Sequence, residues 1–227
     1  MGQAGAYPPC GLAHGASSGA LALLELWSVC DRPRYRAAAF DAFRYERQWF
    51  SRRHGGWPDL RDVGAEDVGR EGALAYPTYW CYGAGGVGLA RLRAWQLTGD
   101  RTALAEANAA LFACKERARH MLAAAPSDAA DFELNASLCH GLGSVLEPLL
   151  YAVRLDHDPE SLALARKLGA ALEARARGQG EWACGVVGGG ETPGLMLGLS
   201  GIGALFLGLH DPRRFHPAGL GPSAEAA

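Results

Sequence analysis

Two short stretches of the sequence place a cysteine beside a ring-bearing residue and follow the pair at once with glycine. They are Cys81-Tyr82-Gly83 and Cys139-His140-Gly141. Two thiolates and one imidazole form a soft ligand set that prefers zinc and leaves the fourth coordination position open, as in a catalytic zinc site. A thiol bound at that position loses its proton and becomes a nucleophile at neutral pH. The competing interpretation is that these cysteines are ordinary core residues, and spacing alone leaves both interpretations open.

Helices must position these residues, and the sequence repeats one helical pattern four times. Each copy has a small or polar residue, then glycines, then an apolar run typical of a buried helix. The equivalent first positions, spaced 68, 58 and 60 residues apart, are His14, Tyr82, His140 and Ser200. A period of this length indicates one supersecondary unit repeated along the chain.

A second, amphipathic helix is predicted in three of these units. The first runs from about Pro33 to Arg52, the second from an N-cap at Asp100 to about Leu122, and the third starts at Asp158-Pro159. The longest non-periodic segment, Ser51 to Tyr79, is predicted to be a loop over one face. Strand signals are almost absent. Apolar helices inside and amphipathic helices outside predict an all-α fold, an α/α toroid of which this chain carries about four repeats.

Composition places the chain among globular proteins, because 49% of its 227 residues are hydrophobic and 20% are charged. The formal net charge of -2 gives no electrostatic case for binding nucleic acid or an anionic membrane. Charged residues of both signs do gather around the first amphipathic helix, and we expect them to form a solvated outer face. They include Asp31, Arg36, Asp41, Arg44, Glu46 and Arg47.

No segment is typical of export or membrane insertion. The N-terminus has no apolar signal core, and glycines interrupt the longest apolar run, Gly194 to Leu209. The six cysteines are widely spaced, which favours metal binding or core packing over disulfides. We therefore expect a cytoplasmic protein that neither binds nucleic acid nor inserts into a membrane.

Three fragments carry a resemblance to a known family. They are YWCYGAGGVGLARL (79–92), LNASLCHGLGSVLEPLL (134–150) and TPGLMLGLSGIGALFLGLHDP (192–212). They resemble signature blocks of the lanthionine synthetase C-like family, which contains the cyclases of lanthipeptide biosynthesis and the C-terminal cyclase domains of type II synthetases. The resemblance extends from about Gly11 to Pro212.

The resemblance implies a toroid with one zinc ion held by Cys81, Cys139 and His140. It implies addition of a peptide cysteine thiolate across dehydroalanine or dehydrobutyrine, which closes a thioether (lanthionine) ring. His14 matches a family histidine that acts as an acid/base group, and Tyr82 matches a ring beside the first zinc cysteine, so both are candidate catalytic residues. The implied substrate is a dehydrated precursor peptide, and the implied partners are a dehydratase or an N-terminal toroid half.

Two departures from the family pattern bear on activity. The position four residues before the first zinc cysteine, an arginine in several cyclases, is Pro77 here. Family members have about seven repeats, and no residue here matches the active-site aspartate of the earlier ones. We therefore expect one domain over residues 1–227, the C-terminal part of a longer ring, with a flexible tail at 213–227.

These departures keep two alternatives open. The first is a degenerate cyclase, a non-catalytic zinc-binding module that holds a peptide or a partner protein. The second is another toroid enzyme, such as one acting on carbohydrate, which would need paired carboxylates at the ends of the inner helices. Glu25 and Glu147 are the only carboxylates in the predicted inner helices, and both lie well past the helix starts, which disfavours that second alternative.

Overall fold

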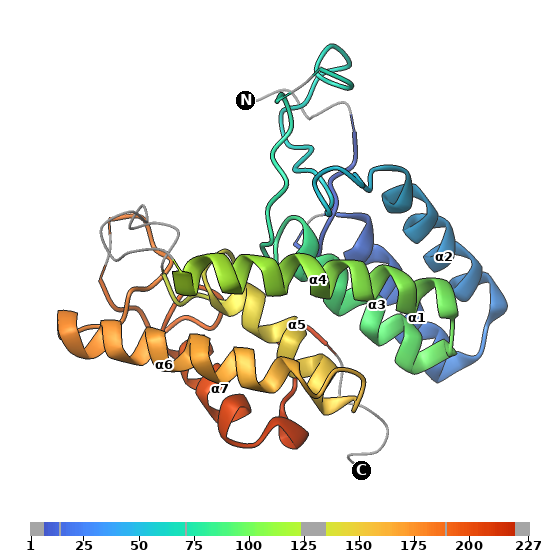
Figure 1. Cartoon of the computed structure of the whole chain (residues 1–227). Helices are drawn as coiled ribbons and strands as arrows, with labels where there is room; N and C mark the ends of the chain where they lie inside the picture. Colours follow the sequence, from blue (N-terminus) through green and yellow to red (C-terminus); the bar gives the residue numbers. More distant parts are fainter. Residues whose placement is uncertain (1–6, 14, 71, 124–134, 189, 221–227) are drawn as a thin grey trace. The chain divides into compact units, whose positions relative to one another are not determined.

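The chain folds into helices joined by turns and one long loop (Figure 1). The computed structural model describes residues 7–13, 15–70, 72–123, 135–188 and 190–220. These ranges contain seven α-helices, one short 3-10 helix and no β-strand. The prediction of an all-α protein is therefore confirmed, and closure of the helices into a toroid stays a prediction. The chain divides into two compact units, Met1–Ala113 and Cys114–Ala227.

The first unit is built around a helix that is buried on every side. Its elements are α1 (Ala16–Cys30), α2 (Pro33–Gln48), α3 (Ala84–Thr98) and the start of α4 (Arg101–Ala123). α1 packs against both α2 and α3. All residues of α3 from 84 to 94 are buried, as its glycine-led apolar sequence predicts. In α2 the buried residues are few and lie on one side of the helix.

One charged residue of α2 does not lie on the solvated face predicted for it. Asp41 and Arg44 form an exposed ion pair at 2.8 Å, in agreement with the prediction. Glu46, however, is fully buried. The reason is that the guanidinium of Arg91, equally buried in α3, lies 2.9 Å from its carboxylate. The prediction of a wholly solvated face is therefore wrong at this position.

The second unit is centred on α5 (Gly143–Arg154). It also contains α6 (Ser161–Gln179), α7 (Leu199–His210) and the 3-10 helix η1 (Pro212–Arg214). α5 packs against all three of these elements and is buried from residue 143 to residue 152. The prediction that the apolar helices are buried is therefore confirmed for α5. It is wrong for part of α7, where Leu207 is 73% exposed.

Most predicted helix starts are confirmed. α1, α3 and α5 begin two or three residues after positions 14, 82 and 140, and α7 begins one residue before Ser200. The carboxylate of Asp100 accepts a hydrogen bond from the N–H of Ala103 at 2.8 Å, which confirms it as the cap of α4. α6 begins at Ser161, two residues after the predicted start at Pro159. Asp158 and Pro159 form a turn before α6, and the carboxylate of Asp158 accepts a hydrogen bond from the hydroxyl of Ser161 at 2.8 Å.

The long segment between α2 and α3 contains no helix in its described part, as predicted. It nevertheless contributes to the core of the first unit. Trp57 and Leu60 are 1% and 0% exposed and pack in one cluster with Cys10, Val87 and Ala110. None of the described helices is both long and apolar enough to cross a membrane.

The expected tail is described only from residue 213 to residue 220. Phe215 is buried there. The N–H of Ala218 donates a hydrogen bond to the carboxylate of Glu147 in α5 at 2.6 Å. The flexibility of segment 213–227 stays a prediction.

Candidate metal centre

Cys81 lies in the turn that starts α3, which we call the Cys81 turn (residues 80–83). The side chain is buried, and the next residue but one, Gly83, has a φ of +96°. A Cβ at Gly83 would lie 2.0 Å from the carbonyl oxygen of Pro77. That same oxygen accepts a hydrogen bond from the N–H of Ala84 at 3.1 Å. Pro77 is therefore part of the backbone arrangement that begins α3.

A segment from the N-terminal part of the first unit lies directly on the Cys81 turn. The N–H groups of Leu12 and Ala13 donate to the carbonyls of Trp80 and Cys81 at 3.3 and 3.2 Å. Gly11 has a φ of +116°, and a Cβ there would lie 2.6 Å from the Cys81 carbonyl oxygen. Only glycine can make this approach without strain. His14, the candidate acid/base residue, lies in the same stretch but outside the described residues.

Tyr82, the second candidate catalytic residue, carries an arginine on its ring. The guanidinium carbon of Arg61 lies 4.0 Å from the ring centroid, within cation–π range. Both oxygens of the Asp59 carboxylate accept hydrogen bonds from Arg61, at 2.5 to 3.0 Å. This pairing raises the pKa of Arg61 above its ordinary value. The long loop thus places a fixed cation beside Tyr82, which the sequence did not predict.

Cys139 and His140 lie in the turn before α5, which we call the Cys139 turn (residues 137–142). The N–H of Cys139 donates to the carbonyl of Met196 at 3.0 Å. Asn135, just before the turn, binds both of its ends. Its side-chain oxygen accepts from the N–H of Ser137 at 3.0 Å, and its carbonyl accepts from the N–H of Leu142 at 2.8 Å. The turn is therefore held by backbone and amide groups.

The two predicted ligands in this turn lie in contact. A hydrogen bond with the Cys139 side chain raises the pKa of His140, and the backbone of Gly185 adds to this effect, while burial opposes it. A Cβ at Gly185 would lie 3.1 Å from Nε2 of His140 and 2.6 Å from Oγ of Ser137. The imidazole thus lies between a thiol and a close-packed backbone. This surrounding is common for a metal-binding histidine, whose second nitrogen usually meets a backbone or carboxylate group.

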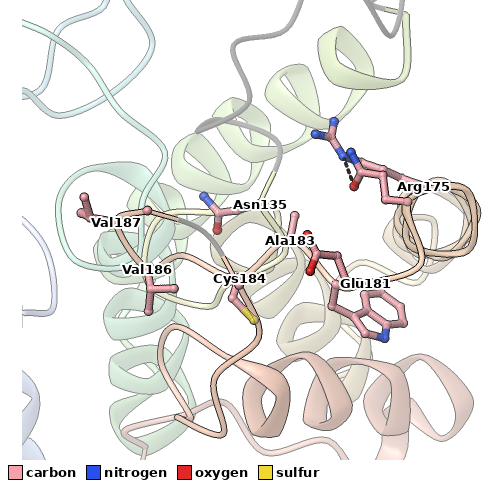
Figure 2. A pocket seen from close by; sticks show the side chains of 11 residues that line it. Asn135, Arg175, Glu181, Ala183, Cys184, Val186 and Val187 are labelled. Atoms are coloured by element: carbon pink, nitrogen blue, oxygen red, sulfur yellow. Dashed lines mark hydrogen bonds between the residues drawn. The ribbon is translucent and has the colours of Figure 1, made fainter.

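The second unit contains a cavity of about 600 Å³. Asn135, which holds the turn, lines it together with Cys184, the neighbour of Gly185. Figure 2 shows these two residues near its middle, between Val186 and Val187 on one side and Arg175 on the other. The cavity combines apolar, thiol and charged groups of both signs, and neither Cys139 nor His140 lines it.

The structure thus groups the predicted site residues in two sets. Cys81 and Tyr82 lie together in the first unit, and Cys139 and His140 lie together in the second. Within the described ranges, no three His, Cys, Asp or Glu side chains form a group that could hold a metal ion. The roles of Arg61, Asn135 and Gly185 beside the site could not be predicted from the spacing of the motifs, because these residues lie in loops of irregular sequence.

Comparison with known proteins identifies the family of the chain. The model of the family described as "Lanthionine synthetase C-like protein" matches residues 8–218. The chain belongs to the lanthionine synthetase C-like family. The match includes both the Cys81 turn and the Cys139 turn, together with every helix described above. No curated protein matches the chain as a relative.

Proposed function

We propose that this lanthionine synthetase C-like protein is a zinc-dependent cyclase that joins peptide cysteines to dehydroalanine or dehydrobutyrine in thioether rings. The observation that carries the proposal is the contact between the Cys139 thiol and the His140 imidazole at the start of a buried helix. Thiol and imidazole are the donor types that zinc prefers. Family membership over nearly the whole chain adds the reaction class.

The ligands of the proposed zinc are Cys81, Cys139 and His140. The surroundings of His140 fit this role, because its imidazole contacts the Cys139 thiol and lies against the backbone of Gly185. A zinc ion bound there would favour the thiolate form of a substrate cysteine.

The chain's own side chains would handle the proton and the peptide. The substrate sulfur forms a bond to the β-carbon of the dehydro residue while the C=C electron pair shifts toward the neighbouring carbonyl oxygen. The α-carbon must then receive one proton, so the sum is an addition without an oxidant or a leaving group. The phenol oxygen of Tyr82 and the imidazole of His14 are the candidate groups to deliver it. Arg61 on the Tyr82 ring would keep that ring in place.

The proposed substrate is a dehydrated precursor peptide. The enzyme that removes water from serine or threonine must act before this chain, so a dehydratase is a natural partner. An N-terminal toroid half is the other proposed partner, and it would complete the proposed ring.

The proposal is tested by measuring metal and thiols on the purified chain. We expect about one zinc per chain, lost in Cys81→Ala and in Cys139→Ala. Cys114→Ala is the matched control, because Cys114 is a fully buried cysteine outside both turns. Incubation with a dehydrated peptide should remove alkylatable peptide thiols without changing the peptide's mass. Full zinc occupancy in Cys139→Ala would contradict the ligand assignment.

The second candidate is a zinc-binding module that holds a peptide without reacting. The structure gives it one argument, because Pro77 takes part in the start of α3 where an arginine stands in several cyclases. Under this alternative the chain would bind zinc and the dehydrated peptide, and the count of peptide thiols would stay constant.

A further inference from the structure

A buried carboxylate in the first unit holds the segment that lies on the Cys81 turn. Glu46 of α2 accepts hydrogen bonds from the N–H groups of Gly11 and Ser17 at 3.0 and 2.9 Å, both through Oε1. Its second oxygen, Oε2, accepts from the hydroxyl of Ser17 at 2.5 Å. One side chain therefore ties down both ends of the segment 11–17.

The charge of this carboxylate is balanced by one arginine. NH2 of Arg91 in α3 donates to Oε2 of Glu46 at 2.9 Å, and both side chains are fully buried. Nε of the same arginine donates to Glu106 of α4 at 2.6 Å. The guanidinium also lies 3.7 Å from the ring centroid of Phe43. Since a buried charge that loses its partner is strongly destabilising, these groups depend on one another.

We propose that Glu46 is a positioning residue for Cys81. The chain of contacts has two steps. Glu46 fixes Gly11 and Ser17, and the amides of Leu12 and Ala13 between them bind the carbonyls of Trp80 and Cys81. An apolar side chain at position 46 could fill the same space but could not accept hydrogen bonds from three donors. The functional meaning rests on the proposed role of Cys81 as a zinc ligand, whereas the positioning itself does not.

Two matched substitutions, each at a glutamate that pairs with Arg91, separate a positioning effect from a general loss of stability. Glu46→Gln keeps the shape of the side chain but replaces one acceptor oxygen by a donor, which cannot serve both Arg91 and the segment 11–17. Glu106→Gln breaks the other ion pair of Arg91 and leaves that segment's contacts intact. The measurement is the alkylation rate of each cysteine in the full-length chain, read by mass spectrometry. Cys114 and Cys184, buried cysteines outside the segment, are the internal references.

We expect Glu46→Gln to raise the alkylation rate of Cys81, relative to these references, about tenfold, which corresponds to about 1.4 kcal/mol of local opening. Glu106→Gln should leave that relative rate within about twofold of the wild type. Ser17→Ala, which removes the hydroxyl contacts with Glu46 and Arg91 but keeps the backbone amide contact, should raise it about threefold and serves if Glu46→Gln does not fold. An equal rise in Glu46→Gln and Glu106→Gln, or no rise in Ser17→Ala, would overturn the proposal.

The same assay distinguishes this inference from the proposed function. Wild-type labelling is repeated after treatment with a zinc chelator. If chelation leaves Cys81 labelling unchanged, the zinc role of Cys81 fails, while the comparison of Glu46→Gln with Glu106→Gln still decides the positioning role.

Discussion

The two turns that carry the predicted ligands share a sequence pattern and differ in what holds them. The Cys81 turn is contacted by a distant segment, which a charged and fully buried pair, Glu46 and Arg91, holds in place. The Cys139 turn is held by neutral groups, the amide of Asn135 and the backbone of Met196. The shared motif, a cysteine and a ring followed by glycine, therefore does not determine which groups hold the turn in place.

The difference extends to the buried glutamate of each unit. Glu46 is neutralised by Arg91. Glu147 in α5 is 1% exposed and accepts one hydrogen bond, from the N–H of Ala218. Its Oε2 has no hydrogen-bond partner within the described ranges. The first unit thus buries a charge pair, whereas the second buries a carboxyl group that burial favours in its neutral form.

The largest expected effect comes from this unpaired carboxyl group. Burial raises the pKa of Glu147 from its ordinary value of 4.5 to about 8. The folded chain therefore keeps a proton that the unfolded chain releases, so the free energy of unfolding should fall as pH rises from about 4.5 to 8. At about 1.4 kcal/mol per pKa unit, the loss amounts to several kcal/mol. Glu147→Gln should remove this pH dependence, measured by urea unfolding at pH 5 and pH 8.

The control for that experiment is a glutamate of the same unit on the surface. Glu173 of α6 forms an exposed ion pair with Arg177. Glu173→Gln should leave the difference between pH 5 and pH 8 as large as in the wild type. If Glu147→Gln also leaves it unchanged, then burial of this carboxyl group is not what lowers stability at pH 8.

The next effect tests the close approach on the Cys81 turn. Gly11→Ala would place a Cβ 2.6 Å from the Cys81 carbonyl oxygen at a φ of +116°. Strain and overpacking together should lower the free energy of unfolding by about 3 kcal/mol. Gly19→Ala is the matched control, because Gly19 lies in α1 with open space around it. It should raise the free energy of unfolding by about 0.5–1 kcal/mol, and a loss there as large as in Gly11→Ala would refute the steric argument.

The corresponding test on the Cys139 turn is Gly185→Ala. The new methyl group would press on Oγ of Ser137 and Nε2 of His140. We expect the free energy of unfolding to fall by about 2 kcal/mol. If the proposed function holds, the zinc content should fall as well. Gly194→Ala in the same loop has nothing within 4 Å of its Cβ position and should change stability by less than about 0.5 kcal/mol. Equal zinc content in both variants would argue that Gly185 does not shape the site.

Helix starts were predictable from the sequence because they depend on local chemistry. Glycines followed by apolar residues gave the starts of α1, α3, α5 and α7, and Asp100 gave the cap of α4. The start of α6 lies two residues after the position predicted from Asp158-Pro159, because this pair forms the turn that precedes the helix. In this chain Asp158 binds the hydroxyl of Ser161, which is the first residue of the helix.

The supports of the site could not be predicted because they depend on long-range contacts. Glu46 lies on the buried side of α2, three residues after Phe43, but its sequence neighbourhood does not reveal a partner for its charge. Its partners are Arg91, which lies 45 positions away in the sequence, and the more distant Gly11 and Ser17. Gly185 likewise lies in a loop whose sequence does not reveal that it contacts His140. Motif matching found the candidate ligands, and the tertiary structure identified what holds them.

The smallest expected effect compares one buried serine from each region. Ser17 donates its hydroxyl to Glu46 at 2.5 Å and accepts from Arg91 at 3.2 Å. Ser17→Ala should therefore lower the free energy of unfolding by about 1.5 kcal/mol, because it removes a hydrogen bond to a charged group.

Ser137 is equally buried, but its Oγ has no hydrogen-bond partner within the described residues. Ser137→Ala removes a buried polar atom and breaks no hydrogen bond, so the free energy of unfolding should change by less than about 0.5 kcal/mol. Urea unfolding of both variants, side by side, measures the contrast between the charged support of the Cys81 turn and the neutral support of the Cys139 turn. If Ser137→Ala is as destabilising as Ser17→Ala, its hydroxyl has a partner in solution, and the two turns are supported more alike than their contacts indicate.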